Sequence, residues 1–281
     1  MKYNIIVLDL HNTIYDEVME YGLAIDEAIK NLPATREVMY RELSEAHAKL
    51  GSDWDDDVWH HMPSLKDVAK EVIEKAIKLR HTKSKELVKA YDHAVETLVE
   101  LKNRGARIYI VTEAAADVGL QAIEWLGLAG IVSGVYTYPS RKPALQLKDT
   151  YHKPFPQIGD THRRKPDPEL LWQVARDDAA AYSISYDEVL RSMIYVGDSK
   201  FKDGMMAKAA GVKFAWAAYG KKIKPGTEAD FARSKEILYA VTGWDKETLK
   251  LTQEASLKPE VNELQPDFIL HDSLREVKEI I

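Results

Sequence analysis

Residues 3–13 read YNIIVLDLHNT, an apolar run that gives way to the carboxylate of Asp9 and then to a polar turn. The unbroken apolar segment at residues 5–8 is typical of a strand that is buried on both faces, as in a parallel sheet covered by helices. Ligands of such sheets bind beyond the carboxyl ends of the strands. Asp9 therefore lies where a nucleophile or metal ligand is expected, although a carboxylate at this place can also cap a turn.

Working outward from this strand, further strand patterns occur in the second half of the chain, with helical patterns between them. The expected strands are residues 106–112, 131–138, 193–196, 212–217 and 267–271. Strands that alternate with helices form βαβ units and a doubly wound parallel sheet. The predicted fold class is therefore α/β.

Between about residues 15 and 105 the sequence shows helical patterns and no convincing strand. The expected helices in this block are residues 22–32, 36–50, 64–79 and 84–104. We therefore expect a core made of residues 1–14 and 106–281, and an α-helical domain, residues 15–105, inserted like a cap at the carboxyl edge of the sheet. Within the core, residues 140–164 are polar and irregular, and residues 221–265 contain two helical patterns, at about 229–241 and 246–255.

The amino-acid composition excludes several classes of ligand and catalytic site. The 281 residues include 39 Lys and Arg against 45 Asp and Glu, a formal net charge of −6, which offers no electrostatic footprint for nucleic acid or an anionic membrane. The chain has no cysteine, which excludes disulfides, thiolate metal sites and Cys nucleophiles. No apolar stretch is long enough to span a bilayer, and no basic leader precedes the first strand. A cytoplasmic enzyme acting on a small molecule fits best, and its oligomeric state stays open.

Two more motifs place polar residues where a phosphate could bind. The strand pattern RIYIVT, residues 107–112, ends in Thr112 and is followed by Glu113. A hydroxyl with a free backbone amide at a strand end can hold a phosphate oxygen. Strands often end in threonine, so this signal alone is weak. Lys165 precedes a helix that Pro166 and Pro168 start. Its ammonium can neutralise a phosphoryl group or a carboxylate, or belong to a solvated basic turn.

The last motif has the composition of a metal site. Residues 194–199 read IYVGDS, with Asp198 directly after Gly197 and Asp203 five residues further on. Glycine permits a tight turn at the end of the strand. Asp198 and Asp203, joined by Asp9 from a neighbouring strand, form an oxygen-rich site that suits Mg²⁺.

Together and in this order, the motifs resemble the signature of the haloacid dehalogenase superfamily, and the helical block resembles the C1-type cap of that family. The resemblance covers nearly the whole chain and implies a Rossmann-like core with an inserted helical cap. It implies that Asp9 attacks phosphorus and forms an aspartyl-phosphate. It also implies that Mg²⁺ is held by Asp9, the backbone carbonyl of His11 and Asp198, with Asp203 a direct or water-mediated ligand.

The same resemblance assigns the residues that bind substrate. Thr112 and the amide of Glu113 would bind the transferring phosphoryl group, with Thr13 of the first motif beside them. Lys165 would steady both Asp9 and that group. Catalysis of this kind consists mostly of positioning and charge neutralisation, since the protein has little covalent work beyond the nucleophile. The expected substrate is a phosphorylated small metabolite.

One position departs from the family pattern. Phosphatases of the superfamily usually carry a second aspartate two residues after the nucleophile, where this chain has His11. Histidine can act as a general acid near neutral pH, although a metal ion beside it would disfavour the imidazolium form. One interpretation is that His11 takes over the acid/base role. The other is that the role is lost, so that the protein is either a slow enzyme or a binding or regulatory protein that keeps the fold. Two other chemistries of the family also lack this aspartate: the metal-free dehalogenases, which the preserved metal motif argues against, and the phosphonatases.

Overall fold

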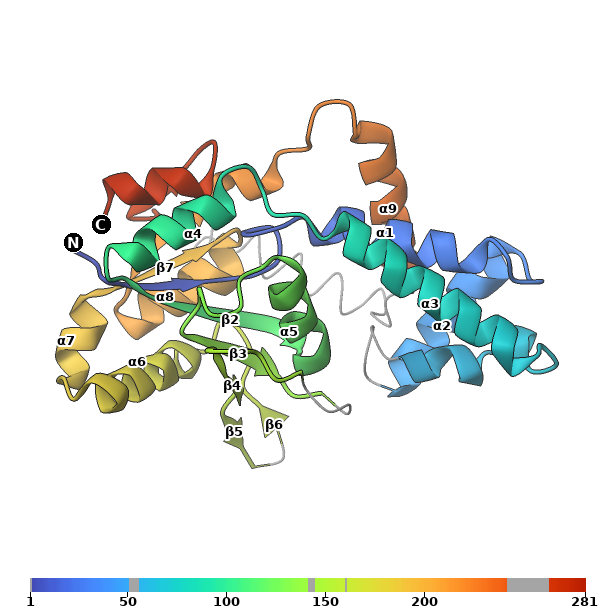
Figure 1. Ribbon diagram of the computed structural model, residues 1–281, viewed down its shortest axis with the longest axis horizontal. Helices are drawn as coiled ribbons and strands as arrows, with labels where there is room; N and C mark the ends of the chain where they lie inside the picture. Colours follow the sequence, from blue (N-terminus) through green and yellow to red (C-terminus); the bar gives the residue numbers. More distant parts are fainter. Residues whose placement is uncertain (1, 51–55, 141–144, 160, 242–262) are drawn as a thin grey trace. The chain divides into compact units, whose positions relative to one another are not determined.

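The computed structural model describes residues 2–50, 56–140, 145–159, 161–241 and 263–281. The chain forms two compact units, and each is assembled from separate stretches of sequence. The first, called the sheet unit, comprises residues 1–16, 90–222 and 255–281; the second, called the helical unit, comprises residues 17–89 and 223–254. Figure 1 labels their elements. No helix in the described parts of the chain is both long and apolar enough to cross a membrane.

The sheet unit is built on a seven-stranded sheet with the order β4-β3-β2-β1-β7-β8-β9. All its paired strands are parallel, which confirms the predicted α/β class. The strands are β1 (Ile5–Leu8), β2 (Arg107–Ala115), β3 (Gly134–Tyr138), β4 (Tyr151–Pro154), β7 (Met193–Gly197), β8 (Lys213–Ala217) and β9 (Phe268–Leu270). A small antiparallel hairpin, β5 (Gln157–Ile158) with β6 (Thr161–His162), follows β4. The central strand is β1, so Asp9 follows it in the middle of the carboxyl edge.

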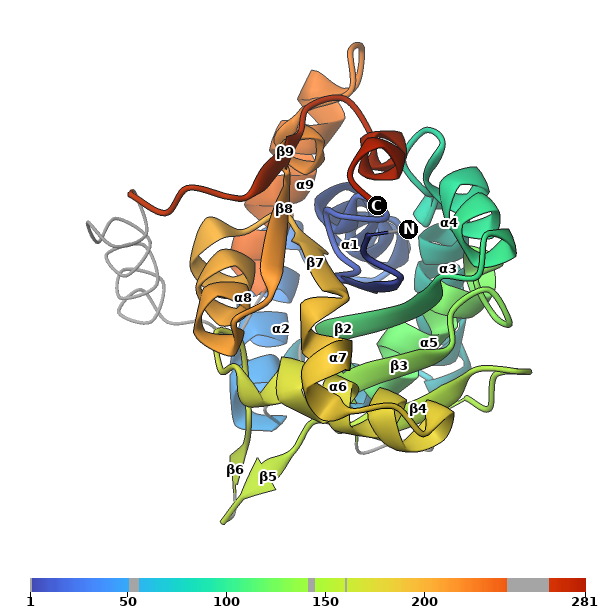
Figure 2. The ribbon, with the colours of Figure 1, turned by 90° about the vertical axis from the view of Figure 1, so that its left-hand side faces the viewer.

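Helices cover both faces of this sheet. They are α4 (Ala94–Asn103), α5 (Ala116–Trp125), α6 (Glu169–Tyr182), α7 (Tyr186–Arg191) and α8 (Met205–Ala210), with short helical turns η3 (Lys200–Gly204), η4 (Ala218–Lys221) and η5 (Leu274–Glu279). Figure 2 shows α4 and α5 on one side of the sheet and α6 and α8 on the other. The face toward α6 and α8 holds one apolar core, in which side chains such as Val7, Val111 and Val174 are fully buried.

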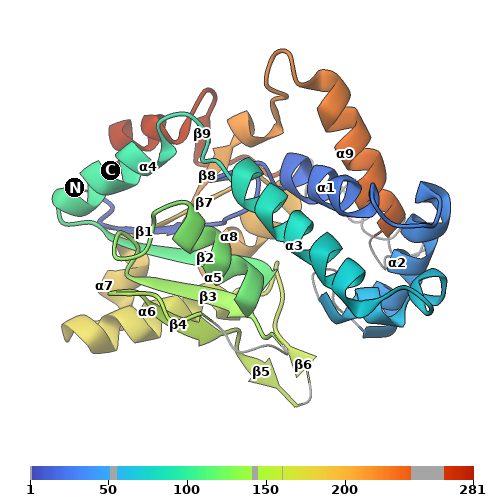
Figure 3. The same cartoon turned by 45° about the vertical axis from the view of Figure 1, so that its right-hand side comes forward.

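The helical unit has its own apolar core. Its helices are α1 (Glu17–Ile29), α2 (Arg36–Leu50), α3 (Lys70–Leu87) and α9 (Glu228–Val241), with short turns η1 (Asp56–His61) and η2 (Pro63–Leu65) (Figure 3). Trp59 and Leu43 are fully buried in this core. Helix α9 packs against α1 at Gly22, where a Cβ atom would lie 2.3 Å from the carbonyl oxygen of Ser234.

The boundaries between the two units differ from the domain boundaries that the sequence predicts. Helix α4, expected in the insertion at residues 15–105, belongs to the sheet unit, where Ala94, Leu98 and Leu101 are fully buried. Residues 223–254, expected in the core, belong to the helical unit. The helix expected at residues 229–241 is α9, whereas the one expected at 246–255 lies outside the described residues.

The helix expected at residues 84–104 is interrupted, so that prediction is wrong. Helix α3 ends at Leu87, and α4 begins only at Ala94. Between them, the amide of Tyr91 donates to the carbonyl of Ile14, and Ala90 forms a β-bridge with Tyr15. These backbone hydrogen bonds replace those of a continuous helix.

Residues 140–164, expected to be irregular, contain the edge strand β4. It pairs in parallel with β3 from Gly134 to Thr137. The hydroxyl oxygens of Tyr136 and Tyr151 are 2.7 Å apart. The ring of Tyr151 also packs against Gly134, where an added Cβ atom would lie only 2.4 Å from the ring. A glycine on the neighbouring strand thus makes room for the large side chain that holds this edge.

Candidate active site

Asp9 is held by the backbone at the carboxyl end of β1. Its amide donates to the carbonyl of Val196 at 2.9 Å, which continues the pairing of β1 with β7. The chain then turns through residues 9–15, called the Asp9 loop, in which the amide of Ile14 donates to the carbonyl of Leu10 at 2.9 Å. Asn12 adopts a left-handed conformation with φ 54°, which asparagine tolerates better than most residues. The turn directs the chain away from the sheet directly after Asp9.

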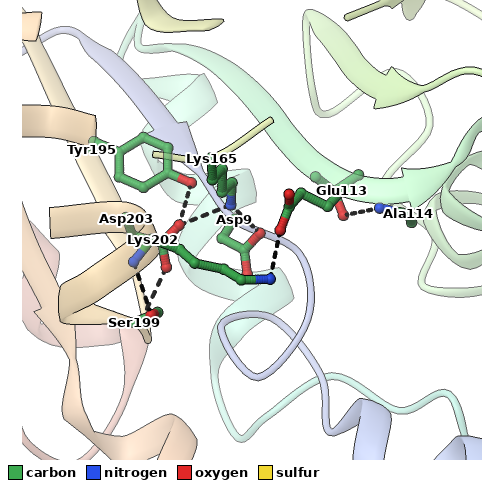
Figure 4. A network of polar contacts seen from close by, with 9 residues as sticks. Asp9, Glu113, Ala114, Lys165, Tyr195, Ser199, Lys202 and Asp203 are labelled. Carbon is green, nitrogen blue, oxygen red and sulfur yellow. Dashed lines mark hydrogen bonds and ion pairs between the residues drawn. The ribbon is translucent and has the colours of Figure 1, made fainter. Parts of the chain in front are cut away.

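Lys165 connects the candidate nucleophile with the last motif. Its Nζ atom donates to Oδ1 of Asp9 at 2.5 Å and to Oδ1 of Asp203 at 2.8 Å (Figure 4). The side chains of all three residues are almost completely buried. Hydrogen bonds to charged groups are the strong ones, most of all where water is excluded. The structure therefore brings together three residues that are far apart in the sequence.

Asp203 is fixed from several directions. Besides the bond from Lys165, its Oδ1 atom accepts a hydrogen bond from the hydroxyl of Tyr195 at 2.9 Å, and its Oδ2 atom accepts one from the amide of Ser199 at 3.0 Å (Figure 4). Burial and the nearby Asp203 charge hold the pKa of Tyr195 well above its usual range, so Tyr195 stays a hydroxyl and donates. Gly197 is required beside this carboxylate, because a Cβ atom there would lie 2.4 Å from it.

Asp9, Asp198 and Asp203 form a cluster that suits a cation. One carboxylate oxygen from each lies within 4.8 Å of the others. Burial, with the charges of Asp203 and Asp9, raises the pKa of Asp198 to about 8. Burial raises the pKa of Asp9 to about 6 against the opposing charge of Lys165. Both carboxyl groups therefore bind a proton more tightly than an exposed aspartate does.

The residues fit a divalent ion. Burial alone would lower the pKa of Lys165, but the carboxylates of Asp203 and Asp9 raise it, so the ammonium stays charged. The three candidate ligand atoms of the cluster are carboxylate oxygens, which hard cations such as Mg²⁺ prefer as ligands. A bound divalent cation would favour the ionised forms of Asp198 and Asp9 against the burial that raises their pKa values.

The candidate phosphoryl-binding residues lie in the second half of β2, which continues to Ala115 instead of ending at Thr112 as expected. Thr112 is buried, and its Oγ1 atom accepts a hydrogen bond from the amide of Ala114 at 3.2 Å. The carboxylate of Glu113 accepts one from Nζ of Lys202 at 2.6 Å, and the amide of Lys202 donates to Oγ of Ser199 (Figure 4). This ion pair ties the end of β2 to residues 198–203, called the Asp198 loop.

Thr13 and His11 lie on the Asp9 loop. Thr13 is fully buried, and within the described residues its hydroxyl oxygen has no hydrogen-bond partner. The half-buried imidazole of His11 packs edge-on against Tyr15, with ring centroids 5.3 Å apart. A positive charge on His11 would lower the pKa of Asp9.

The sequence motifs assign no role in the site to Tyr195 or Lys202. The sequence places Tyr195 in a buried strand and Lys202 at the start of a helical pattern, with no hydrogen-bond partner indicated for either. One signal could have pointed to Tyr195, namely a polar hydroxyl within the otherwise apolar strand before Gly197. A buried tyrosine usually finds a hydrogen-bond partner. For Lys202 the partner, Glu113, is 89 residues away in the sequence.

Comparison with known proteins places the site in context. The family model for haloacid dehalogenase-like hydrolases matches residues 3–211. No curated protein matches the sequence. Among solved structures, a predicted phosphoglycolate phosphatase from Haemophilus somnus 129pt is 17% identical, with 100% of this chain and 98% of that chain covered and a TM-score of 0.48. The HAD-hydrolase YfnB from Bacillus subtilis, bound to magnesium, is 18% identical, with 80% and 93% covered and a TM-score of 0.48. Every candidate site residue lies within the range that the family model matches.

Proposed function

This chain belongs to the haloacid dehalogenase-like hydrolase family, and from that premise we propose that it is a Mg²⁺-dependent phosphatase acting on a phosphorylated small metabolite. The observation that carries the proposal is the bridge of Lys165 between Asp9 and Asp203, beside Asp198. It combines a positioned carboxylate, a fixed positive charge and an oxygen-rich cation site, which phosphoryl transfer requires.

In the proposed reaction, a carboxylate oxygen of Asp9 forms a bond to phosphorus while the bond between phosphorus and the leaving oxygen breaks. The leaving oxygen takes up a proton. A water molecule then attacks the phosphorus, its proton passes to a base, and the bond to Asp9 breaks to release phosphate and restore the carboxylate. Lys165 keeps Asp9 oriented and offsets negative charge on the phosphoryl oxygens.

Other residues of the site would hold the metal ion and the phosphoryl group. Asp9, Asp198 and the carbonyl of His11 would hold Mg²⁺, with Asp203 acting directly or through water; the ion would supply positive charge to the phosphoryl oxygens. Thr112 and the amide of Glu113 would bind the transferring group. Thr13, on the Asp9 loop, would lie beside them.

The test is a screen for turnover. A panel of phosphorylated metabolites and a general phosphatase substrate are assayed with Mg²⁺ and with a chelator. Turnover that requires Mg²⁺ supports the proposal. A second function, a binding or regulatory protein, is favoured by His11, which stands where the family's phosphatases have an acid/base aspartate. Absence of turnover across the panel, with a phosphorylated ligand still bound, would favour this second function.

The affinity for Mg²⁺ is expected to rise with pH. A carboxyl group is protonated below its pKa, and the pKa of Asp198 is about 8. Below that pH, Mg²⁺ must displace a proton, so its affinity should rise by about tenfold per pH unit from pH 6 to 8 and level off above. Calorimetric titration of the substrate-free protein measures this slope, with Asp198→Asn as the control that loses binding. An affinity that does not change with pH would contradict a site made of these carboxylates.

Replacing His11 by aspartate is expected to raise kcat by roughly ten- to a hundredfold, because a positioned general acid contributes about that much or more. Aspartate is the acid/base residue that the family's phosphatases carry at this position. Steady-state kinetics on a substrate with a poor leaving group measures the effect. His11→Asn, which cannot titrate, is the matched control. If His11→Asp slows turnover and His11→Asn abolishes it, the imidazole is itself the acid/base.

A further inference from the structure

The segment 213–221 lies outside all the motifs that the sequence points to, yet it contacts two of them. It comprises β8 and η4 and is called the support segment. β8 pairs with β7, so that Trp216 stands opposite Gly197. From this position the indole Nε1 atom of Trp216 donates a hydrogen bond to the backbone carbonyl of Asp198 at 2.8 Å. The first residue of the Asp198 loop is therefore held by a side chain from the neighbouring strand.

The same segment also holds the Asp9 loop. The buried hydroxyl of Tyr219 donates to the backbone carbonyl of Thr13 at 2.6 Å. One residue later, Gly220 lies so close to the loop that a Cβ atom would be 1.7 Å from the carbonyl oxygen of Asn12. No other amino acid fits at Gly220 without moving one of the two backbones.

Both contacts end on backbone carbonyls of loops that carry candidate metal ligands. The ring of Tyr91 packs edge-on against Tyr219 with centroids 5.5 Å apart, and Nζ of Lys200 lies 4.7 Å from the centre of the Trp216 ring. The two aromatic side chains are thus fixed on more than one side. Rigid aromatic groups that donate to a backbone set its position rather than merely fill space.

We propose that the support segment sets the spacing between the Asp9 loop and the Asp198 loop, and that Trp216 and Tyr219 are positioning residues for the metal ligands. This inference rests on the proposed function, because it concerns the Mg²⁺ site. Mg²⁺ demands near-octahedral geometry at about 2.0–2.1 Å, so small displacements of its ligands weaken binding. Hydrogen bonds behind the ligands are what fix such distances.

The experiment compares two pairs of variants by calorimetric titration of Mg²⁺ into the substrate-free protein. Trp216→Phe removes the donor to Asp198, and its control is Trp172→Phe, because the half-buried indole of Trp172 donates to the carbonyl of Ala210, outside both loops. Tyr219→Phe removes the donor to Thr13, and its control is Tyr109→Phe, whose hydroxyl donates to Asp178.

We expect Trp216→Phe and Tyr219→Phe to raise the dissociation constant for Mg²⁺ by roughly ten- to a hundredfold, with each control within about twofold of the wild type. Far-UV circular dichroism verifies that each variant is folded. If Trp216→Phe does not fold, the comparison of Tyr219→Phe with Tyr109→Phe tests the inference. Unchanged affinity in Trp216→Phe and Tyr219→Phe, or an equal loss in the controls, would overturn the inference. A wild-type protein that binds no Mg²⁺ would overturn the proposed function, and the inference with it.

Discussion

Replacing Asp9 by asparagine is expected to reduce kcat by more than about a thousandfold and to leave the fold intact, because an amide cannot form the acyl-phosphate that the proposed reaction requires. Asparagine has nearly the shape of aspartate, and its carbonyl oxygen can still accept the hydrogen bond from Lys165. The substitution also removes a buried carboxylate whose pKa is raised to about 6. Such a group binds its proton more tightly in the folded state, so its ionised form destabilises the fold above about pH 6.

Two measurements check this result. Steady-state kinetics gives the loss of kcat, and thermal unfolding at about pH 8 should show a midpoint no lower than that of the wild type. Asp177→Asn is the matched control, since Asp177 is a partly buried aspartate that accepts a hydrogen bond from Tyr136, outside the candidate site. Its kcat should stay within about twofold of the wild type. Turnover by Asp9→Asn clearly above background would show that another group is the nucleophile.

The sequence predicted most of the sheet for a physical reason. Strands buried on both faces are continuous apolar runs, and β1, β2 and β7 show them clearly. Strand β4 gave no such signal, because it is a four-residue edge strand whose side chains are mostly exposed. The break between α3 and α4 was missed for another reason. The hydrogen bonds that replace the helix come from Ile14 and Tyr15, which are distant in the sequence.

The candidate site could be located from the sequence because parallel strands end at one edge of a sheet. Asp9 and Asp198 each directly follow a strand, and Thr112 lies in the second half of β2, so the topology brings them to the same edge. What the sequence could not predict is how these residues are held. Tyr195 and Trp216 act through single hydrogen bonds that depend on side-chain direction, and that direction exists only in the folded chain.

Lys165→Met is expected to lower both activity and stability. It removes a positive charge from two almost completely buried carboxylates, those of Asp9 and Asp203. Loss of one fixed charge that stabilises a phosphoryl transition state lowers kcat by roughly a hundred- to a thousandfold. Breaking a buried ion pair by removing one partner destabilises the fold by about 3–5 kcal/mol at neutral pH. Urea unfolding and steady-state kinetics measure the two effects.

The pH dependence of the destabilisation by Lys165→Met shows whether Lys165 stabilises the fold through its charge or through packing. The pKa of Asp9 is already raised to about 6 by burial, and Lys165 is the strongest influence that opposes the rise, so removing Lys165 raises that pKa further. A protonated carboxyl group needs no cation, so the loss of stability should shrink at about pH 5 and be largest at about pH 8. Adding Asp203→Asn to Lys165→Met should recover part of the stability, because it removes one uncompensated charge. Equal destabilisation at both pH values, with no recovery in the double variant, would mean that Lys165 stabilises the fold through packing rather than through its charge.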